Sequence, residues 1–224
     1  MFALVLSVAF IGCTKADPID ETLGKVIAAY GGKKNLEKLK SYRQIWAIKS
    51  MMGGAAGSES RFVDGDKRLR VEVVYPKSAE IRLIDGERGF RVSNAGMVDA
   101  KGPSLFAMKL QRLRVSSLLY LLEKKQFLTL SEVEGFTVLS FKEGELTGNY
   151  YINPKTFMIE KFSGSFMMGD RQMEFIAQYS EFKEVDGVVM PHKELKSAMG
   201  ITTAEMTLRL TEFVEHGDDI FKLQ

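Results

Sequence analysis

One apolar helical stretch interrupts a chain that otherwise has the pattern of short β-strands and tight turns, and this contrast constrains the fold most. The stretch runs from Pro103 to Lys125, and Ser104 is placed to cap the start of a helix. The pattern breaks near Arg112, so we expect either one helix or two. An apolar helix inserted among strands must cover an apolar surface, and we expect it to lie over the concave face of a curved sheet. Its apolar residues are Leu105, Phe106, Met108, Leu110, Leu113, Val115, Leu118, Leu119, Leu121 and Leu122.

Alternating patterns and turn signals fill most of the remaining chain. Asp-Gly pairs at Asp64-Gly65, Asp85-Gly86 and Asp186-Gly187 are typical of hairpin turns. The strands follow one another without room for crossover helices, so the sheet is predicted to be antiparallel. We expect about ten strands, which is more than a flat twisted sheet usually holds without curling. The predicted fold class is α+β, mainly antiparallel β: an incomplete β-barrel with helices covering its concave face.

A short helical region precedes the strands. Asp17 is expected to cap the first helix, with Pro18 at the first helical position. Gly31-Gly32 ends that helix, and a second short helix is expected from Lys33 to Leu39. We expect residues 17–224 to form a single domain, with residues 103–125 as a helical lid insert. The apolar stripe of the first helix consists of Ile19, Leu23, Val26, Ile27 and Tyr30.

The composition excludes several classes of function. Lysine and arginine total 31 against 29 aspartates and glutamates, so the near-zero net charge of +2 argues against a nucleic-acid-binding protein. One cysteine and two histidines cannot form an internal disulfide or a zinc site of the usual Cys/His kind. We expect no metal and no cofactor. We also expect a monomer.

The first 16 residues are predicted to be a targeting segment that takes no part in the fold. Phe2–Gly12 is apolar but too short to span a membrane as a helix. Two processing alternatives remain open: a lipobox ending at Cys13, which would then carry the lipid, or ordinary cleavage after Ala16. Both predict export to the periplasm, and the lipobox adds an N-terminal lipid anchor in the membrane, with the outer membrane as the expected location.

No catalytic motif is recognisable. His192 follows Pro191 in a predicted strand without a paired nucleophile, and His216 lies in a polar turn. The chain has no nucleophile elbow, phosphate-binding loop or dinucleotide fingerprint. We therefore predict that the protein is not an enzyme, and an envelope hydrolase is disfavoured.

The candidate ligand-binding residues are apolar positions on predicted strands and on the insert. We expect Trp46 and Phe62 to meet Phe106 and Leu110 across a cavity beneath the lid. Methionines such as Met108 and Met173 suit an adaptable lipid pocket as well as an ordinary core, and both interpretations stay open. The full candidate set is Trp46, Ile48, Phe62, Leu69, Val71, Leu83, Phe106, Leu110, Leu118, Leu119 and Phe175.

Several turn motifs resemble those of a known family. They are Tyr30-Gly31-Gly32, the segment from Tyr151 to Thr156, and the segment from Val185 to His192 that follows Tyr179 and Phe182. Together they resemble the LolA/LolB-like lipoprotein-carrier superfamily of the bacterial envelope, in its uncharacterised outer-membrane lipoprotein-sorting branch. The resemblance implies an incomplete β-barrel with a helical lid over an apolar cavity that binds acyl chains. It assigns no individual ligand residue, and the arginine that couples lid and barrel in some type carriers has no counterpart assigned here.

Two functions of different classes follow. The first is a periplasmic or outer-membrane carrier that holds the acyl chains of a lipid or an acylated lipoprotein in an apolar cavity. The second is an envelope interaction or sensor module that uses the half-barrel as a platform without transport. A continuous apolar cavity would favour the carrier, whereas an interior filled by its own side chains would favour the platform.

Overall fold

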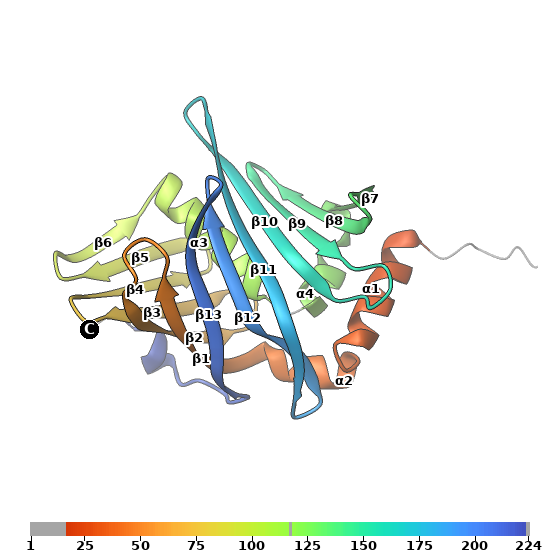
Figure 1. Cartoon of the computed structure of the whole chain (residues 1–224), viewed down its shortest axis with the longest axis horizontal. Helices are drawn as coiled ribbons and strands as arrows, with labels where there is room; N and C mark the ends of the chain where they lie inside the picture. The colour runs from red at the N-terminus through yellow and green to blue at the C-terminus, as the bar shows by residue number, and fades with distance from the viewer. Residues whose placement is uncertain (1–16, 117, 223–224) are drawn as a thin grey trace, which may run out of the picture.

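The computed structural model describes residues 17–116 and 118–222, so Cys13 and the predicted targeting segment lie outside the described residues. Its main feature is a single sheet of 13 antiparallel strands (Figure 1). The spatial order is β6-β5-β4-β3-β2-β1-β13-β12-β11-β10-β9-β8-β7. The strands are β1 Ser41–Ser50, β2 Ala56–Asp64, β3 Arg68–Tyr75, β4 Ser78–Asp85, β5 Arg88–Ser93, β6 Gly96–Ala100, β7 Leu128–Val133, β8 Phe136–Glu143, β9 Leu146–Ile152, β10 Ile159–Met168, β11 Arg171–Val185, β12 Val188–Ala198 and β13 Ile201–Glu212.

The sheet consists of two meanders joined at one place. Strands β1 to β6 form the first meander, and β7 to β13 form the second. The two meet where β1 pairs antiparallel with β13, with Trp46 opposite Leu208 and a bulge between Ile45 and Trp46. The first strand in the sequence is therefore hydrogen-bonded to the last strand in the sequence, while β6 and β7 form the two edges of the sheet.

Within residues 17–116 and 118–222, four α-helices lie against this sheet: α1 Pro18–Ala29, α2 Lys33–Leu36, α3 Pro103–Val115 and α4 Leu118–Glu123. Asp17 caps α1, because its side chain accepts a 3.0 Å hydrogen bond from the Ile19 amide. The predicted capping role of Ser104 is wrong: Gly102 is the capping residue of α3, and Pro103 occupies the first turn. The lid insert forms two helices, and α3 continues to Val115 before it ends.

Helix α3 shows that the sheet is strongly curved. Arg112 at its C-terminal end donates a 2.5 Å hydrogen bond to the Gly86 carbonyl between β4 and β5, and the Tyr150 hydroxyl of β9 donates a 3.0 Å bond to the Leu113 carbonyl. Seven strands lie between β4 and β9 in the sheet order. In a flat sheet those strands would be roughly 38 Å apart, at ~4.8 Å per spacing. A helix of about 10–12 Å diameter touches both, so the sheet wraps around α3 as an open half-barrel.

Helix α1 is fastened to the hairpin between β11 and β12. The Val189 amide donates a 3.1 Å hydrogen bond to the Tyr30 carbonyl, and the Tyr30 hydroxyl accepts a 3.1 Å bond from the Ile159 amide. Gly31 has φ +105, and a Cβ built there would lie 2.0 Å from the Gly187 carbonyl oxygen. Two of the turn motifs that resemble the carrier superfamily are therefore in direct contact, and this contact requires glycine.

The mainly antiparallel β fold is confirmed, and the unclosed sheet is compatible with the expected half-barrel, but the sheet has 13 strands instead of about ten. The exposed edge strand β6 lacks an alternating pattern, so its sequence carries no strand signal. Strand β12 continues through Pro191. Pairing of β12 with β13 begins only at Lys193, so the missing proline N–H leaves no gap in that ladder.

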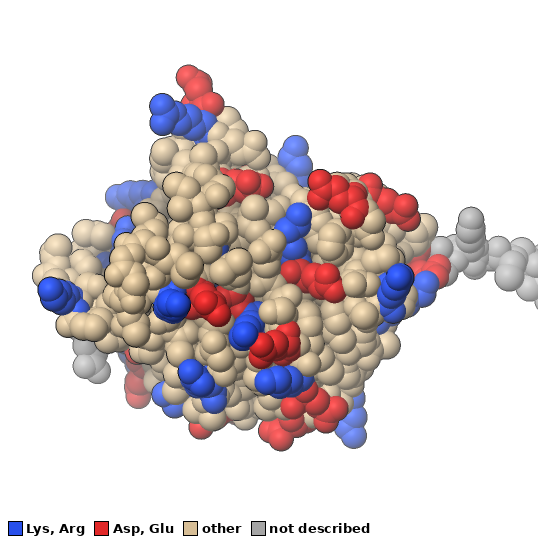
Figure 2. Space-filling view, in the orientation of Figure 1, with Lys and Arg blue, Asp and Glu red and all other residues tan. Residues whose placement is uncertain are grey.

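Charge is mixed on the surface of the second meander. Figure 2 shows basic and acidic side chains interspersed over the face formed by β10 to β13. Within the part of the chain that the structure describes, none of the helices is both long enough and apolar enough to cross a membrane.

Candidate functional site

A cavity of about 530 Å³ lies beneath α3. Its apolar wall includes Leu110 of α3, Phe162 and Phe166 of β10, and Met173 and Phe175 of β11. Ligand pockets for small molecules typically have volumes of about 300–1,000 Å³, with mostly apolar walls and a few polar groups. The cavity therefore has the size and the lining of a site for a largely apolar ligand.

A stack of aromatic rings connects the lid with the sheet. Phe106 of α3 stacks on Phe166 at 5.6 Å between ring centroids, and Phe166 stacks on Phe175 at 5.9 Å. Aromatic pairs in this range of distances add about 0.5–1.5 kcal/mol beyond their buried area. The lid helix is thus held to the cavity wall by apolar contacts that an apolar ligand could replace.

Three glycines allow α3 to approach the sheet closely. A Cβ added at Gly164 of β10 would lie 2.7 Å from Leu110 Cδ2, and one at Gly148 of β9 would lie 2.7 Å from Leu113 Cδ2. On the opposite side, a Cβ at Gly89 of β5 would lie 2.8 Å from Leu105 Cδ1. Each leucine of the lid therefore occupies space that a larger strand residue would take.

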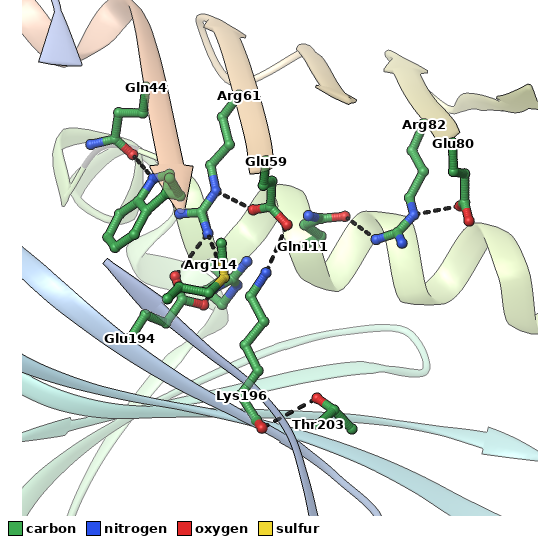
Figure 3. Close-up of polar contacts among 12 residues, drawn as sticks. Gln44, Glu59, Arg61, Glu80, Arg82, Gln111, Arg114, Glu194, Lys196 and Thr203 are labelled. Carbon is green, nitrogen blue, oxygen red and sulfur yellow. Dashed lines mark hydrogen bonds and ion pairs between the residues drawn. The ribbon is translucent and has the colours of Figure 1, made fainter. Parts of the chain in front are cut away.

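A cluster of five charged side chains, all buried except Lys196, lies beside the cavity, between α3 and the sheet (Figure 3). Arg61 of β2 donates hydrogen bonds to Glu59 at 2.6 Å and to Glu194 of β12 at 2.8 Å. Arg114 of α3 forms an ion pair with Glu194, and Lys196 of β12 donates a 2.9 Å hydrogen bond to Glu59. The side chains are 0–9% exposed except Lys196, which is 22% exposed. We call these five residues the charge cluster.

Burial and mutual contacts shift the pKa values of the residues in the charge cluster. Burial alone would raise the pKa of Glu59, but the charges of Lys196 and Arg61 hold that pKa well below its ordinary value. Burial lowers the pKa of Lys196 well below its ordinary value; Glu59 opposes this effect, and the charges of Arg114 and Arg61 add to it. Burial also lowers the pKa of Arg114, with a further contribution from Arg61.

Neutral side chains complete the surroundings of the cluster. The Arg61 guanidinium lies over the Trp46 ring at 4.6 Å, and the Trp46 indole donates a 3.1 Å hydrogen bond to Gln44. The Tyr179 hydroxyl is hydrogen-bonded to Arg114, and burial raises the pKa of this tyrosine. Every element that meets here contributes a polar group to the network, as buried charges require.

The C-terminal carbonyl groups of α3 are also satisfied from the sheet. The Tyr42 hydroxyl donates a 2.8 Å hydrogen bond to the Val115 carbonyl, in addition to the bond from Tyr150 to Leu113. Burial raises the pKa of Tyr42 to about 12, although Arg61 and Arg114 oppose this effect. Both hydroxyls therefore remain protonated donors at neutral pH.

The structure brings part of the predicted set to the main cavity and its rim. Leu110 and Phe175 line the cavity, and Phe106 stacks on its wall. Trp46 and Leu118 instead line a second, smaller cavity of about 130 Å³ on the other side of Arg114. Four further candidates are buried in the core and line neither cavity: Ile48, Leu69, Val71 and Leu119.

Two predicted residues lie on the other face of the sheet. Phe62 contacts His216 at 5.7 Å and Arg43 at 5.5 Å, whereas its neighbour Arg61 points into the half-barrel. Leu83 is paired with Arg70, whose guanidinium donates a hydrogen bond to the C-terminal Ile220 carbonyl. The expected meeting of Phe62 with the lid is therefore not seen.

Sequence reasoning missed the charge cluster entirely. Glu59 and Arg61 are two residues apart on β2, and Glu194 and Lys196 have the same spacing on β12. Period-two spacing places each pair on one face of its strand. Charged residues on a strand normally indicate the solvated face, however, so this spacing alone does not predict that the four side chains are buried.

Among the described residues, no group of three or more histidine, cysteine, aspartate or glutamate side chains is arranged to hold a metal ion. His192 Nδ1 lies 3.2 Å from the Met190 carbonyl, and His216 Nε2 lies 2.9 Å from the Tyr42 carbonyl. Both histidines therefore contact backbone groups.

An open antiparallel half-barrel with a helical lid over an apolar cavity defines the class of this protein. No family model matches the sequence, and neither does any curated protein. Solved structures do match. A LolA superfamily protein from Nitrosomonas europaea has a TM-score of 0.61 at 10% identity, over 91% of this chain and 97% of that one.

Two further solved structures have the same fold. A DUF1329 family protein from Desulfovibrio piger has a TM-score of 0.55 at 12% identity, over 92% of this chain and 98% of that one. A domain from Vibrio parahaemolyticus, described as an outer membrane lipoprotein-sorting protein, has a TM-score of 0.52 at 8% identity, over 88% and 94%. The chain therefore has the LolA-like fold that its turn motifs implied.

Proposed function

We propose that this protein is an exported, non-enzymatic carrier that holds an acyl chain in the cavity beneath α3. The observation that carries the proposal is the cavity of about 530 Å³, whose apolar wall is shared between a lid helix and the sheet. In this proposal an acyl chain replaces the contact between Phe106 of α3 and Phe166 of the sheet. In this proposal the protein acts in the periplasm as a monomer, and lipidation at Cys13 would attach it to the outer membrane.

Binding to such a cavity is expected to be reversible. Burying an acyl chain of about 15 methylenes would contribute roughly 12 kcal/mol at ~0.8 kcal/mol per methylene. Immobilising the chain and displacing lid contacts such as Phe106 on Phe166 oppose that gain. A carrier needs this balance, because it must both take up and release its ligand.

Exposed apolar side chains next to the cavity mouth suggest how the ligand reaches it. Three hairpin tips adjoin one another: the Met51 amide donates to the Thr203 carbonyl at 2.9 Å, and the Met199 amide donates to the Glu174 carbonyl at 3.0 Å. Met168 of β10 and Thr203 of β13 also line the cavity. We call these tips the apolar rim; its exposed members are Met51, Met52, Met167, Met168, Met199 and Ile201. Such a rim fits contact with a membrane surface from which lipid is taken.

Native mass spectrometry tests the proposal directly. The full chain, with its own N-terminal segment, would be expressed in a bacterium and purified from the membrane fraction in a mild detergent. We expect a lipid or acylated species to remain bound and to be released on unfolding. Absence of any bound species, together with no uptake of a fluorescent acyl probe by the delipidated protein, would contradict a carrier function.

A cavity-filling variant supplies the structural control. Ala107 of α3 is half-buried and lines the cavity, so Ala107→Phe should fill part of it and weaken probe binding by about tenfold or more, equivalent to ~1.4 kcal/mol per tenfold. The matched variant Ala95→Phe places the same ring in an exposed turn and should leave binding unchanged. Equal binding by both variants would favour the alternative function, an interaction or sensor platform with no ligand in the cavity.

A further inference from the structure

The charge cluster contains one more cation than it has carboxylates. Its cations are Arg61, Arg114 and Lys196, and its carboxylates are Glu59 and Glu194, which leaves 3 − 2 = +1. An unbalanced buried charge is costly in a protein interior. By formal charge the cluster is therefore incomplete, although it is well connected by hydrogen bonds and ion pairs. The pKa of Lys196, which is lowered by burial and by the charges of Arg114 and Arg61, reflects the same excess of positive charge.

The same imbalance recurs on the β4–β5 side of the cavity. Glu80 of β4 accepts hydrogen bonds from Arg82 at 2.6 Å and from Arg91 of β5 at 3.1 Å, so two cations share one carboxylate. All three of these side chains line the cavity, and Arg82 also contacts Gln111 of the lid helix at 3.4 Å. Both charged parts of the cavity lining therefore have an excess of basic side chains.

Lys196 is the member of the cluster that a ligand can reach. Its side chain is 22% exposed, compared with 0–9% for the other four, and it lines the cavity together with Arg114. Glu59 accepts one hydrogen bond from its ammonium group, which has three N–H donors. Figure 3 shows the Lys196 side chain rising from β12 toward Glu59 under the lid helix. The ammonium group is thus placed at the junction of the charge cluster and the apolar cavity.

We propose that the cavity takes an amphiphile with a single hydrocarbon chain and one anionic group, a carboxylate or a phosphate, which binds at Lys196 and Arg114. This inference rests on the proposed carrier function and makes it more specific. The hydrocarbon chain lies along Leu110, Phe166 and Phe175, and the anion supplies the negative charge that the cluster lacks. Acyl chains esterified in neutral lipids would gain nothing from these cations.

Binding of matched ligands to the delipidated full chain tests this inference. The probes are palmitate, hexadecanol and 1-palmitoyl lysophosphatidic acid, each measured by displacement of a fluorescent acyl probe. Because hydrogen bonds to charged groups are stronger than neutral ones, we expect the anionic probes to bind about tenfold or more tightly than hexadecanol. A tighter complex with palmitate would identify a carboxylate ligand, and a tighter complex with lysophosphatidic acid would identify a phosphate ligand.

Two lysine variants test whether the preference for anionic probes arises at the charge cluster. Lys196→Met balances the cluster at two cations and two carboxylates, so it should fold, and it should lose most of the preference for palmitate over hexadecanol. Lys193→Met is the matched control: Lys193 lies on the same strand, is paired with Glu181 at 2.8 Å and is 43% exposed, and its removal should leave the preference intact.

The outcomes separate the inference from the function on which it rests. Hexadecanol and palmitate binding equally well to the unmodified protein would overturn the anionic ligand and leave the carrier function standing. No binding of any probe would overturn both. A preference for palmitate that survives in Lys196→Met would overturn the assignment of the anion to this cluster.

Discussion

Arg61 of β2 donates a 2.8 Å hydrogen bond to Glu194 of β12, although β1 and β13 lie between these two strands. In a flat sheet, strands three positions apart are about 14 Å from one another, at ~4.8 Å per spacing. The two side chains meet because the sheet is concave and its inward residues converge. Since Arg114 of α3 pairs with the same carboxylate, this contact also connects the lid to both meanders.

The charge count predicts that removing the charge of Glu194 destabilises the protein more than removing the charge of Arg114. Glu194→Gln would leave three cations against one carboxylate, and we expect it to lower the free energy of unfolding by about 3–5 kcal/mol. Arg114→Met leaves two of each sign, with Glu194 still bound to Arg61, and should cost clearly less. Urea denaturation measures both. An equal loss would show that the excess positive charge has no energetic weight.

Glu59 should make the protein sensitive to acid. Its pKa is held below the ordinary value of 4.5, so the ionised carboxylate contributes its full stabilisation above that pH and loses it as the pH falls toward the folded-state pKa. We expect the melting temperature of the unmodified protein to fall more steeply between about pH 5 and pH 3 than the melting temperature of Glu59→Gln, which lacks this carboxylate. Parallel curves for the two proteins would contradict this role for Glu59.

The glycines under α3 predict that a single added methyl group will loosen the lid. Gly164→Ala places a Cβ 2.7 Å from Leu110 Cδ2, and the resulting overpacking should cost about 1–3 kcal/mol. Hydrogen exchange of the α3 amides should accelerate at the same time. In the control Gly24→Ala, no atom lies within 4 Å of the new Cβ, and the helical context should stabilise the protein by about 0.5–1 kcal/mol. Similar effects of the two changes would contradict close packing of the lid.

The apolar rim predicts a change in transfer rate without a change in affinity. Met52 and Ile201 are 71% and 59% exposed, so Met52→Glu combined with Ile201→Glu should leave the fold and the cavity intact. We expect slower uptake of a fluorescent lipid from neutral vesicles, with unchanged equilibrium binding of the free probe. Val133→Glu, on the exposed edge strand β7, is the control for added negative charge. Uptake at the original rate would show that the rim takes no part in loading.

Much of the fold was predictable because its signals are local. The first helix is capped by Asp17, and the Asp-Gly pairs form turns where they were expected. On β3 and β11 the apolar alternation also predicts the inward face correctly, with Val71 in the core and Phe175 at the cavity. Composition and spacing decide such features without tertiary contacts.

The candidate site was less predictable because the concave face of the sheet carries charged side chains. On β2 the rule that apolar residues point inward selected Phe62, but the covered face belongs to Glu59 and Arg61. A shift of one residue exchanges the two faces of a strand, so this one assignment hid the cluster. On β4, Arg82 likewise faces the lid while Leu83 lies on the other face. Only the partners on β12 and α3 make the buried charges acceptable, and those partners are far away in sequence.

The pairing of β1 with β13 has a consequence for the order in which the chain folds. Residues 41–50 can complete their hydrogen bonds only after residues 201–212 are present, so the seam between the meanders closes last. Non-local pairing of this kind slows folding and leaves strand edges uncovered in the meantime. For a chain that emerges on the far side of a membrane N-terminus first, we expect a half-assembled sheet in which β1 is paired with β2 but its other edge is still open. This would be the state most prone to aggregation and most in need of a chaperone.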